Sequence, residues 1–183
     1  MTVLGVLDPP HVLPLMDFVR RIRAQGRSMP SVDPKDGGIL AKVLFLQMTA
    51  GPIAVGTGII SQDNDDPTAH NMKLTLSETG FLRSDVVLWN VVPYYVSTIE
   101  ESRTPTGAQI RQAAPYTQAF VDELKSLKVV VYCGLDAQKQ RKYLRFPADV
   151  HQLETNHLAG QSYNHKRKEI QATFKQAYDL VMR

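Results

Sequence analysis

The sequence predicts an α/β fold of three layers (α/β/α), with helices on both faces of a central, mainly parallel sheet of about four strands. Short apolar runs alternate along the chain with segments whose apolar residues recur at helical spacing, and this order is typical of parallel sheets covered on both faces. The 183 residues contain no internal repeat and no low-complexity linker. We therefore expect one domain over residues 1–183, large enough to bury its core without disulfides.

Four short apolar runs are the expected strands, the last weaker than the others. They are KVLFLQM (42–48), DVVLWNVV (85–92), KVVVYCG (128–134) and part of ADVHQLETNH (148–157). Turn-rich residues predict loops at 28–38 and 49–66, the second with at most a short extended piece.

Helical spacing of apolar residues predicts the helices between the strands. They cover residues 11–25, 67–79, 106–126, 135–144 and 164–182, the last being amphipathic. Asp66 is the expected N-cap of the second helix, Pro67 its first residue and Gly80 its stop. Pro115 is expected to interrupt or start the third.

The composition limits the class of protein. The single cysteine, Cys133, lies in an apolar run and cannot hold an iron–sulfur cluster, which needs about four thiolates. The first ten residues, MTVLGVLDPP, lack the basic start of a signal peptide, and no run approaches the roughly 18–20 apolar residues of a membrane span. We therefore expect a soluble cytoplasmic protein with no membrane association.

The charge is mildly basic, with a net charge of +3 and a pI near 9.0. Basic residues cluster at 20–23, 139–145 and 165–168. Each cluster could contact phosphates or form a solvated helix face, and its composition does not decide between these.

Three distinctive loops are expected at one edge of the sheet. They are QMTAGP (47–52), the turn after Asn90, and NHLAGQS (156–162), and each follows a predicted strand. Ligands of parallel α/β folds bind at the carboxyl ends of the strands. His157 would thus lie at the mouth of a cleft.

The segment ETGFLRSDVVLWNVVPYY, followed by the late His loop, resembles the uracil-DNA glycosylase superfamily, most closely its family-four type. The resemblance extends from about residue 40 onward. It implies that Asn90 reads the base, since an amide accepts from a pyrimidine N3–H and donates to O4, a pattern that cytosine reverses. The alternative is an Asn that caps a turn at the strand end.

The first motif of the superfamily, Gly-Gln-Asp-Pro-Tyr or Gly-Glu-Ala-Pro-Gly, corresponds to QMTAG (47–51) and departs from it. Thr49 stands at the position of the water-activating aspartate. Gly51 stands at the position of the tyrosine that excludes thymine, so this loop leaves space there and does not ensure strict selectivity for uracil; Gly51 would also approach the DNA. The resemblance implies that Gln47, Met48 and Thr49 border the base through their backbone groups.

Carboxylates follow this loop. We favour Asp63 or Asp65 as the group that positions water, with Asp66 committed to the cap; all three could instead serve only the helix start. Asn64 occupies the position of the base-stacking Phe of family four, so another aromatic residue, for which Tyr94 and Tyr95 are candidates, would stack on the base.

HLAGQS (157–162) matches the His-Pro-Ser-Pro-Leu-Ser loop of the superfamily at its first and last residues. The resemblance implies that His157 stabilises negative charge on the pyrimidine O2, that Ser162 grips a phosphate, and that Gln161 enters the gap left by the extruded nucleotide. Lys166 and Arg167, in the basic run that follows, would contact DNA. The alternative is that His157 is an ordinary solvent-exposed residue of a loop.

These residues predict a monomeric, monofunctional uracil-DNA glycosylase of base excision repair that needs no cofactor and no metal and acts on uracil-containing DNA. One alternative is a non-catalytic module that binds uracil-containing or damaged DNA on the same fold. A second is an unrelated α/β hydrolase or ligand-binding domain, although the chain has neither a G-x-S-x-G elbow nor a phosphate-binding P-loop.

Overall fold

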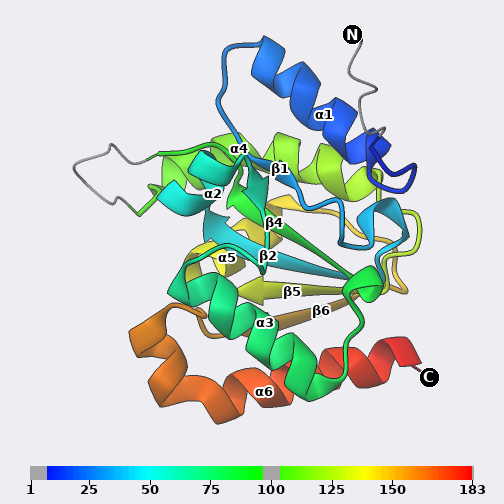
Figure 1. Cartoon of the computed structure of the whole chain (residues 1–183), viewed down its shortest axis with the longest axis vertical. Helices are drawn as coiled ribbons and strands as arrows, with labels where there is room; N and C mark the ends of the chain where they lie inside the picture. Colours follow the sequence, from blue (N-terminus) through cyan, green and yellow to red (C-terminus); the bar gives the residue numbers. More distant parts are fainter. Residues whose placement is uncertain (1–7, 97–103, 183) are drawn as a thin grey trace, which may run out of the picture.

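The computed structural model of the protein describes residues 8–96 and 104–182 and has helices on both sides of a parallel sheet (Figure 1). The sheet has four strands in the order β4-β2-β5-β6, and all neighbours are parallel. The strands are β2 (Val43–Thr49), β4 (Val86–Val92), β5 (Val129–Cys133) and β6 (His151–Thr155). The predicted α/β/α class and the four predicted strands are confirmed.

The strand register brings the carboxyl ends of all four strands to one edge, on the left in Figure 1. Gln47 of β2 pairs with Asn90 of β4, and Cys133 of β5 pairs with Thr155 of β6. The central strands are buried on both faces, which explains their continuous apolar sequences.

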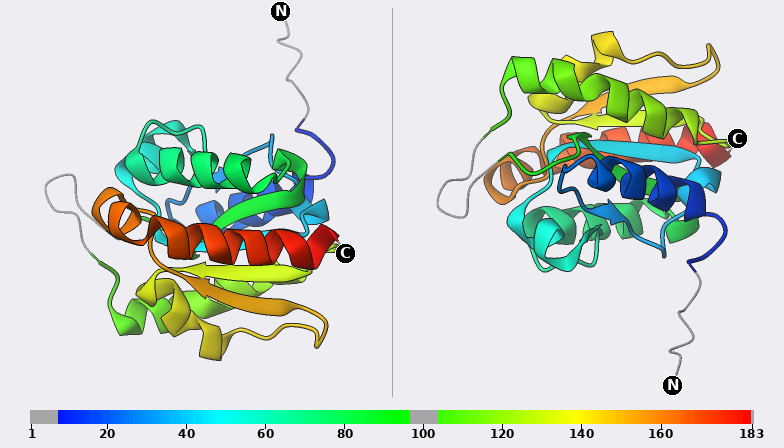
Figure 2. Two further views of the ribbon diagram at one scale, coloured as in Figure 1. Left: turned by 90° about the horizontal axis from the view of Figure 1, so that it is seen from below. Right: turned by 90° about the horizontal axis from the view of Figure 1, so that it is seen from above.

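Aromatic side chains fill the two layers between the sheet and the helices. On one face, Phe18 of α1 (Leu13–Ala24) and Phe120 of α4 (Gly107–Asp122) pack on Trp89, whose ring stacks on that of Phe120 at 4.1 Å. On the other face, Phe45 contacts Phe174 of α6 (Gly160–Met182), with ring centroids 4.6 Å apart. Helices α3 (Pro67–Thr79) and α6 lie together over this second face (Figure 2).

The helix boundaries follow the local sequence closely. The Asp66 carboxylate accepts from the N–H groups of Thr68 and Ala69, and Gly80 ends α3 with a φ of 89°, as predicted. Helix α4 instead runs through Pro115, because Thr106 and Gln109 form a capping box that starts it earlier.

Three segments differ from the prediction. The expected loop 49–66 contains α2 (Pro52–Thr57) and β3 (Ile59–Ile60), and β3 pairs with β1 (Ser31–Val32) from the other expected loop. The expected helix 135–144 divides into α5 (Leu135–Gln140) and a 3₁₀ turn, Arg141–Tyr143. Helix α6 starts at Gly160 and therefore takes the second half of HLAGQS into its first turn.

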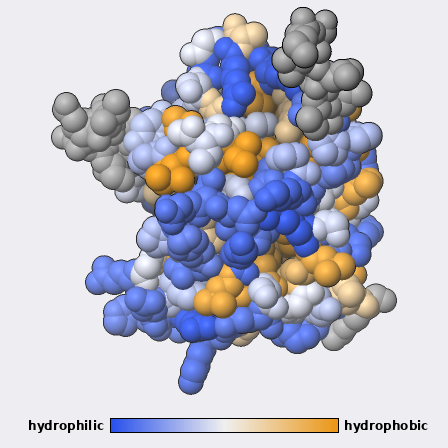
Figure 3. Space-filling view, in the orientation of Figure 1, coloured by the Kyte–Doolittle hydropathy of each residue, from blue (hydrophilic) through white to orange (hydrophobic). Residues whose placement is uncertain are grey.

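The surface in the orientation of Figure 1 is mainly hydrophilic, and its apolar side chains form separate patches (Figure 3). Within the described ranges, no helix is long and apolar enough to cross a membrane. Residues 1–7, on which the signal-peptide prediction partly rests, lie outside the described residues.

Candidate functional site

A pocket of about 280 Å³ opens at the carboxyl edge of the sheet. Its walls come from the end of β2, the middle of β4, the α2–β3 segment, the start of α3 and the loop after β6. Of the residues proposed from the sequence for the base site, those that line it are Gln47, Met48, Thr49, Gly51, Asn64, Asn90, Tyr95 and His157. Segments far apart in the sequence thus meet in one cavity, and its size suits a single pyrimidine ring better than a large ligand.

Asn90 lies on β4 at the floor of the pocket and is 2 % exposed. Among residues 8–96 and 104–182, no side chain or backbone group forms a hydrogen bond with its amide. Its amide atoms are not among the fully buried side-chain atoms that lack a partner, so they are accessible from the pocket. An unpaired amide that faces a cavity is therefore well placed to recognise a ligand.

His157 faces the same pocket with one ring nitrogen already in use. Its Nδ1 accepts the Ala159 N–H at 2.9 Å, and since a backbone N–H can only donate, the proton of the neutral ring must be on Nε2. Burial lowers the pKa of His157 below its ordinary value, although Asp136 opposes this shift. At neutral pH the residue is thus an uncharged Nε2–H donor.

The backbone holds this histidine from two sides. Asn71 of α3 donates from its side-chain amide to the Leu158 carbonyl at 2.7 Å, and the Leu158 side chain is buried. Gly134, at the end of β5, donates its N–H to the Thr155 carbonyl at 2.9 Å and packs directly against the imidazole. The ring is therefore fixed before any ligand arrives.

The first loop contributes backbone and a hydroxyl group. Thr49 donates from its Oγ1 to the Tyr94 carbonyl at 3.2 Å, so this hydroxyl links two strand ends. Gly51 is exposed at the N-cap of α2, where an added Cβ would meet open space. The position that the resemblance gives to a water-activating carboxylate thus carries a neutral side chain.

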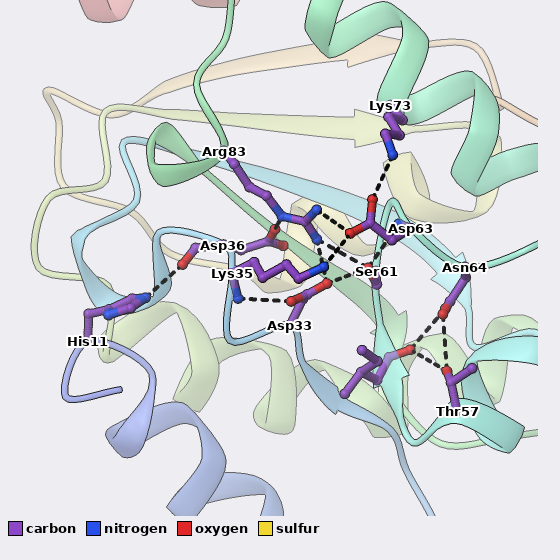
Figure 4. A network of polar contacts seen from close by, with 11 residues as sticks. His11, Asp33, Lys35, Asp36, Thr57, Ser61, Asp63, Asn64, Lys73 and Arg83 are labelled. Carbon is purple, nitrogen blue, oxygen red and sulfur yellow. Dashed lines mark hydrogen bonds and ion pairs between the residues drawn. The ribbon is translucent and has the colours of Figure 1, made fainter. Parts of the chain in front are cut away.

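The structure does not bring the two favoured carboxylates into the pocket. Asp63 turns away from it, towards Lys35, Lys73 and Arg83, whose nitrogens lie 2.6–3.0 Å from its oxygens (Figure 4). These contacts, with Lys73 foremost, hold the pKa of Asp63 well below its usual range. The Asp65 side chain is 97 % exposed and lines no part of the pocket. The ion pairs of Asp63 and the exposure of Asp65 to solvent explain why neither carboxylate serves the cavity.

Asp66 is the carboxylate that does line the pocket, contrary to its expected commitment to the cap alone. Its Oδ1 accepts both capping hydrogen bonds, each 3.0 Å long. Its Oδ2 makes no hydrogen bond within the described part of the chain. One oxygen therefore holds the helix while the other is left for a ligand or a water molecule.

The other walls are partly apolar. Asn64 lines the pocket, but its amide is occupied, since it donates to the Ile59 carbonyl at 3.0 Å and accepts from Thr57 at 3.1 Å. Tyr95 lines the pocket, whereas the ring of Tyr94 lies against Tyr116 and Arg27. Of the two candidate aromatic residues, the pocket thus favours Tyr95.

Sequence reasoning missed Ile60 and Ser61, which also line the pocket. Ile60 belongs to β3, which pairs with Val32 of β1. Nothing in an isolated run of two isoleucines shows that it forms a pocket wall, because this depends on pairing with a distant strand.

The expected DNA-binding residues of the late loop lie on α6. Ser162 lines a second hollow beside the pocket, while Gln161 is exposed in the first turn. Lys166 pairs with Glu169 at 2.9 Å, and Arg167 pairs with Glu78 of α3. Both cations remain nearly half exposed, and phosphates could compete for them only by displacing these partners.

The donor chemistry of the described residues does not form a metal site. No group of three or more His, Cys, Asp or Glu side chains in the described ranges is arranged to hold an ion. Cys133 is buried, and burial raises the pKa of its thiol. One cysteine cannot replace the four thiolates of an iron–sulfur cluster.

This architecture defines an α/β protein with a small pocket at the carboxyl edge of its sheet, where an unpaired amide and a neutral imidazole converge. The family model of the Uracil DNA glycosylase superfamily matches residues 34–180, which is most of the chain. The protein therefore belongs to the Uracil DNA glycosylase superfamily. No curated protein matches the chain significantly.

Proposed function

We propose that the protein is a monofunctional DNA glycosylase that removes uracil from DNA and leaves an abasic site. The observation that carries this proposal is the unpaired, buried amide of Asn90 opposite the Nε2–H donor of His157 in one pocket. Membership of the superfamily supports a glycosylase acting on DNA. The choice of uracil rests on the hydrogen-bonding pattern of the amide.

The target bond joins C1′ of deoxyribose to N1 of the base, which is inaccessible in stacked DNA, so the nucleotide must leave the stack. In the pocket, the Asn90 amide would accept from N3–H and donate to O4. As the glycosidic bond breaks, the electron pair moves onto the base, and Nε2–H of His157 would donate to O2. A preorganised donor of this kind lowers the barrier by about 3 kcal/mol.

The carboxylate of Asp66 would orient the attacking water. Its unoccupied Oδ2 can accept a hydrogen bond from the water, while Oδ1 keeps the carboxylate fixed at the start of α3. Water bonded to Oδ2 would then attack the sugar cation at C1′, and its proton would pass to the carboxylate.

Excision of uracil from a labelled oligonucleotide, followed by alkaline cleavage, tests the proposal. We expect strand scission with uracil and much less with cytosine, whose hydrogen-bonding pattern is reversed, or with the larger hypoxanthine. Thymine shares the N3–H and O4 of uracil, so its excision measures whether the space left by Gly51 admits the methyl group. His157→Ala should lower the single-turnover rate at least ~100-fold while DNA binding persists. Absence of scission from every uracil substrate, with retained binding to DNA, would overturn the enzymatic assignment.

A non-catalytic module that binds uracil-containing or damaged DNA remains the second candidate. The observation that favours it is Thr49, whose hydroxyl is bonded to the Tyr94 carbonyl where the resemblance places an activating carboxylate. A mobility-shift assay run beside the cleavage assay distinguishes the two candidates. Preferential binding of uracil-containing DNA without scission would support the module.

A further inference from the structure

Leu135 is an apolar side chain exposed beside the base pocket. It is 76 % exposed, more than any other large hydrophobic residue of the described ranges. It is the first residue of α5, directly after Gly134 at the end of β5. Exposed leucines need no explanation when they are scattered singly, but this one lies at the edge where the pocket opens.

The second hollow, of about 390 Å³, connects Leu135 with the pocket. Leu135 and Ser162 line this hollow together with Met48 and His157, and the last two also line the base pocket. The two cavities are therefore neighbours that share Met48 and His157 as wall residues. A nucleotide that entered the pocket would leave the adjoining base pair close to Leu135.

The backbone keeps this leucine from moving inward. Gly134 is bonded through its N–H to Thr155, and its carbonyl accepts the Gln138 N–H at 3.1 Å. The Gln138 side chain donates to the Thr155 carbonyl at 3.1 Å. The start of α5 is thus tied to the end of β6, and Leu135 projects from a rigid support.

Basic residues follow Leu135 on the same short segment, which suits a polyanion. Lys139 and Arg141 are half exposed and paired with Asp136 and Glu154. Lys142 lies over the ring of Tyr143 at 5.1 Å, with no acidic partner among the described residues. An apolar side chain beside basic residues suits binding to DNA. The phosphates would contact the basic side chains, and the bases would contact Leu135.

We propose that Leu135 is a wedge that inserts into the base stack of duplex DNA beside the extruded nucleotide. The proposal rests on the proposed function, because it concerns the DNA that this site engages. Apolar wedges act by unstacking a base step, and a single-stranded substrate has little stacking to disrupt. Leu135 is therefore a positioning residue for duplex substrates and touches no reacting atom.

Comparison of duplex and single-stranded substrates tests the wedge. Leu135→Ala should lower the single-turnover excision rate on duplex DNA about 10-fold or more and change the rate on the matching single strand by less than about 2-fold. Leu82→Ala is the matched control, because Leu82 is 66 % exposed but lies before β4, at the opposite edge of the sheet. Equal effects on the two substrates, or no effect on the duplex, would overturn the proposal.

A fluorescence assay separates failure of the wedge from failure of the proposed activity. Duplex DNA with 2-aminopurine beside the uracil brightens when the base step unstacks. The unmodified protein and Leu82→Ala should raise this signal, and Leu135→Ala should not, whether or not any base is excised. Equal signals from all three proteins would refute the wedge, whereas absence of excision alone would refute only the proposed function.

Discussion

Gly134 lies against His157 so closely that a Cβ built on the glycine would be 3.0 Å from Cδ2 and 3.1 Å from Cβ of the histidine. The glycine also has a φ of 90°, which side chains rarely adopt. The end of β5 thus sets the position of the imidazole that follows β6, and the two loops act as one unit.

Gly134→Ala should impair excision more than it impairs folding. The added methyl group would push His157 out of line, and a displacement of about 1 Å can cost up to ~100-fold in rate. The φ of 90° with a ψ of 163° lies in a region that is essentially restricted to glycine, so the strain should lower the free energy of unfolding by about 1–3 kcal/mol. Single-turnover excision and urea unfolding measure the two effects.

The control for this prediction is Gly107→Ala, since an added Cβ there meets open space. It should leave both quantities nearly unchanged. A Gly134→Ala protein with a normal excision rate would show that the fixed position of the imidazole is unimportant.

Asn90→Leu should separate function from stability. A leucine of similar volume replaces an amide that is accessible from the pocket and bonds to no other described group, so the free energy of unfolding should change by less than about 1.5 kcal/mol. Excision should nevertheless fall at least ~100-fold, because the base loses its specific hydrogen bonds. Urea denaturation and single-turnover excision test this, and loss of stability together with retained activity would refute the assigned role.

Asp66→Asn should reduce excision without loosening α3. Asparagine caps a helix about as well as aspartate, so stability should change by only a few tenths of a kcal/mol, whereas removal of a water-orienting carboxylate should cost at least ~100-fold in rate. Asp63→Asn should behave in the opposite way. It should lower the free energy of unfolding by about 1 kcal/mol, since its partially exposed ion pairs are screened, and leave excision unchanged.

Circular dichroism, urea unfolding and excision assays on both variants decide between the two aspartates. If Asp63→Asn lowered the excision rate more than Asp66→Asn, the water would be positioned by Asp63 and its ion-pair network and not by the carboxylate that caps α3.

The strands and the capped helix α3 could be predicted because their signals are local. An apolar run such as Val129–Cys133 has few alternatives to a buried strand, and Asp66 with Pro67 marks a helix start by itself. Segments α2 and β3 could not be predicted, since a six-residue helix that contains Gly56 has little intrinsic stability, and β3 forms only by pairing with β1.

The positions of Asn90 and His157 at the pocket could be predicted from the sequence, but the carboxylate that lines the pocket could not. Asn90 lies near the carboxyl end of β4 and His157 follows β6, so topology alone brings them to one edge. Asp63, Asp65 and Asp66 are neighbours in the sequence, and only the direction of the turn before α3 decides which faces the cavity. The exposure of Leu135 could not be predicted, because an apolar residue at the start of a helix is usually expected to be buried in the core.

The buried cluster around Arg83 should make stability depend on pH. Asp36 is 1 % exposed and bonded to Arg83 at 2.9 Å, and its Oδ2 has no partner among the described residues (Figure 4). Burial raises its pKa to about 7, opposed by Arg83 and reinforced by the neighbouring carboxylates of Asp33 and Asp63. The folded protein therefore binds a proton here that the unfolded chain releases near pH 4.

Because the folded-state pKa is the higher one, this contribution to stability is complete below about pH 4 and is lost as the pH rises to about 7. In urea unfolding between pH 4.5 and 8, Asp36→Asn should remove a decline of more than about 1 kcal/mol, since each pKa unit corresponds to about 1.4 kcal/mol. Asp179→Asn, at an exposed ion pair of α6, should retain the decline. Identical pH profiles for the unmodified protein and Asp36→Asn would show that Asp36 stays ionised in the fold.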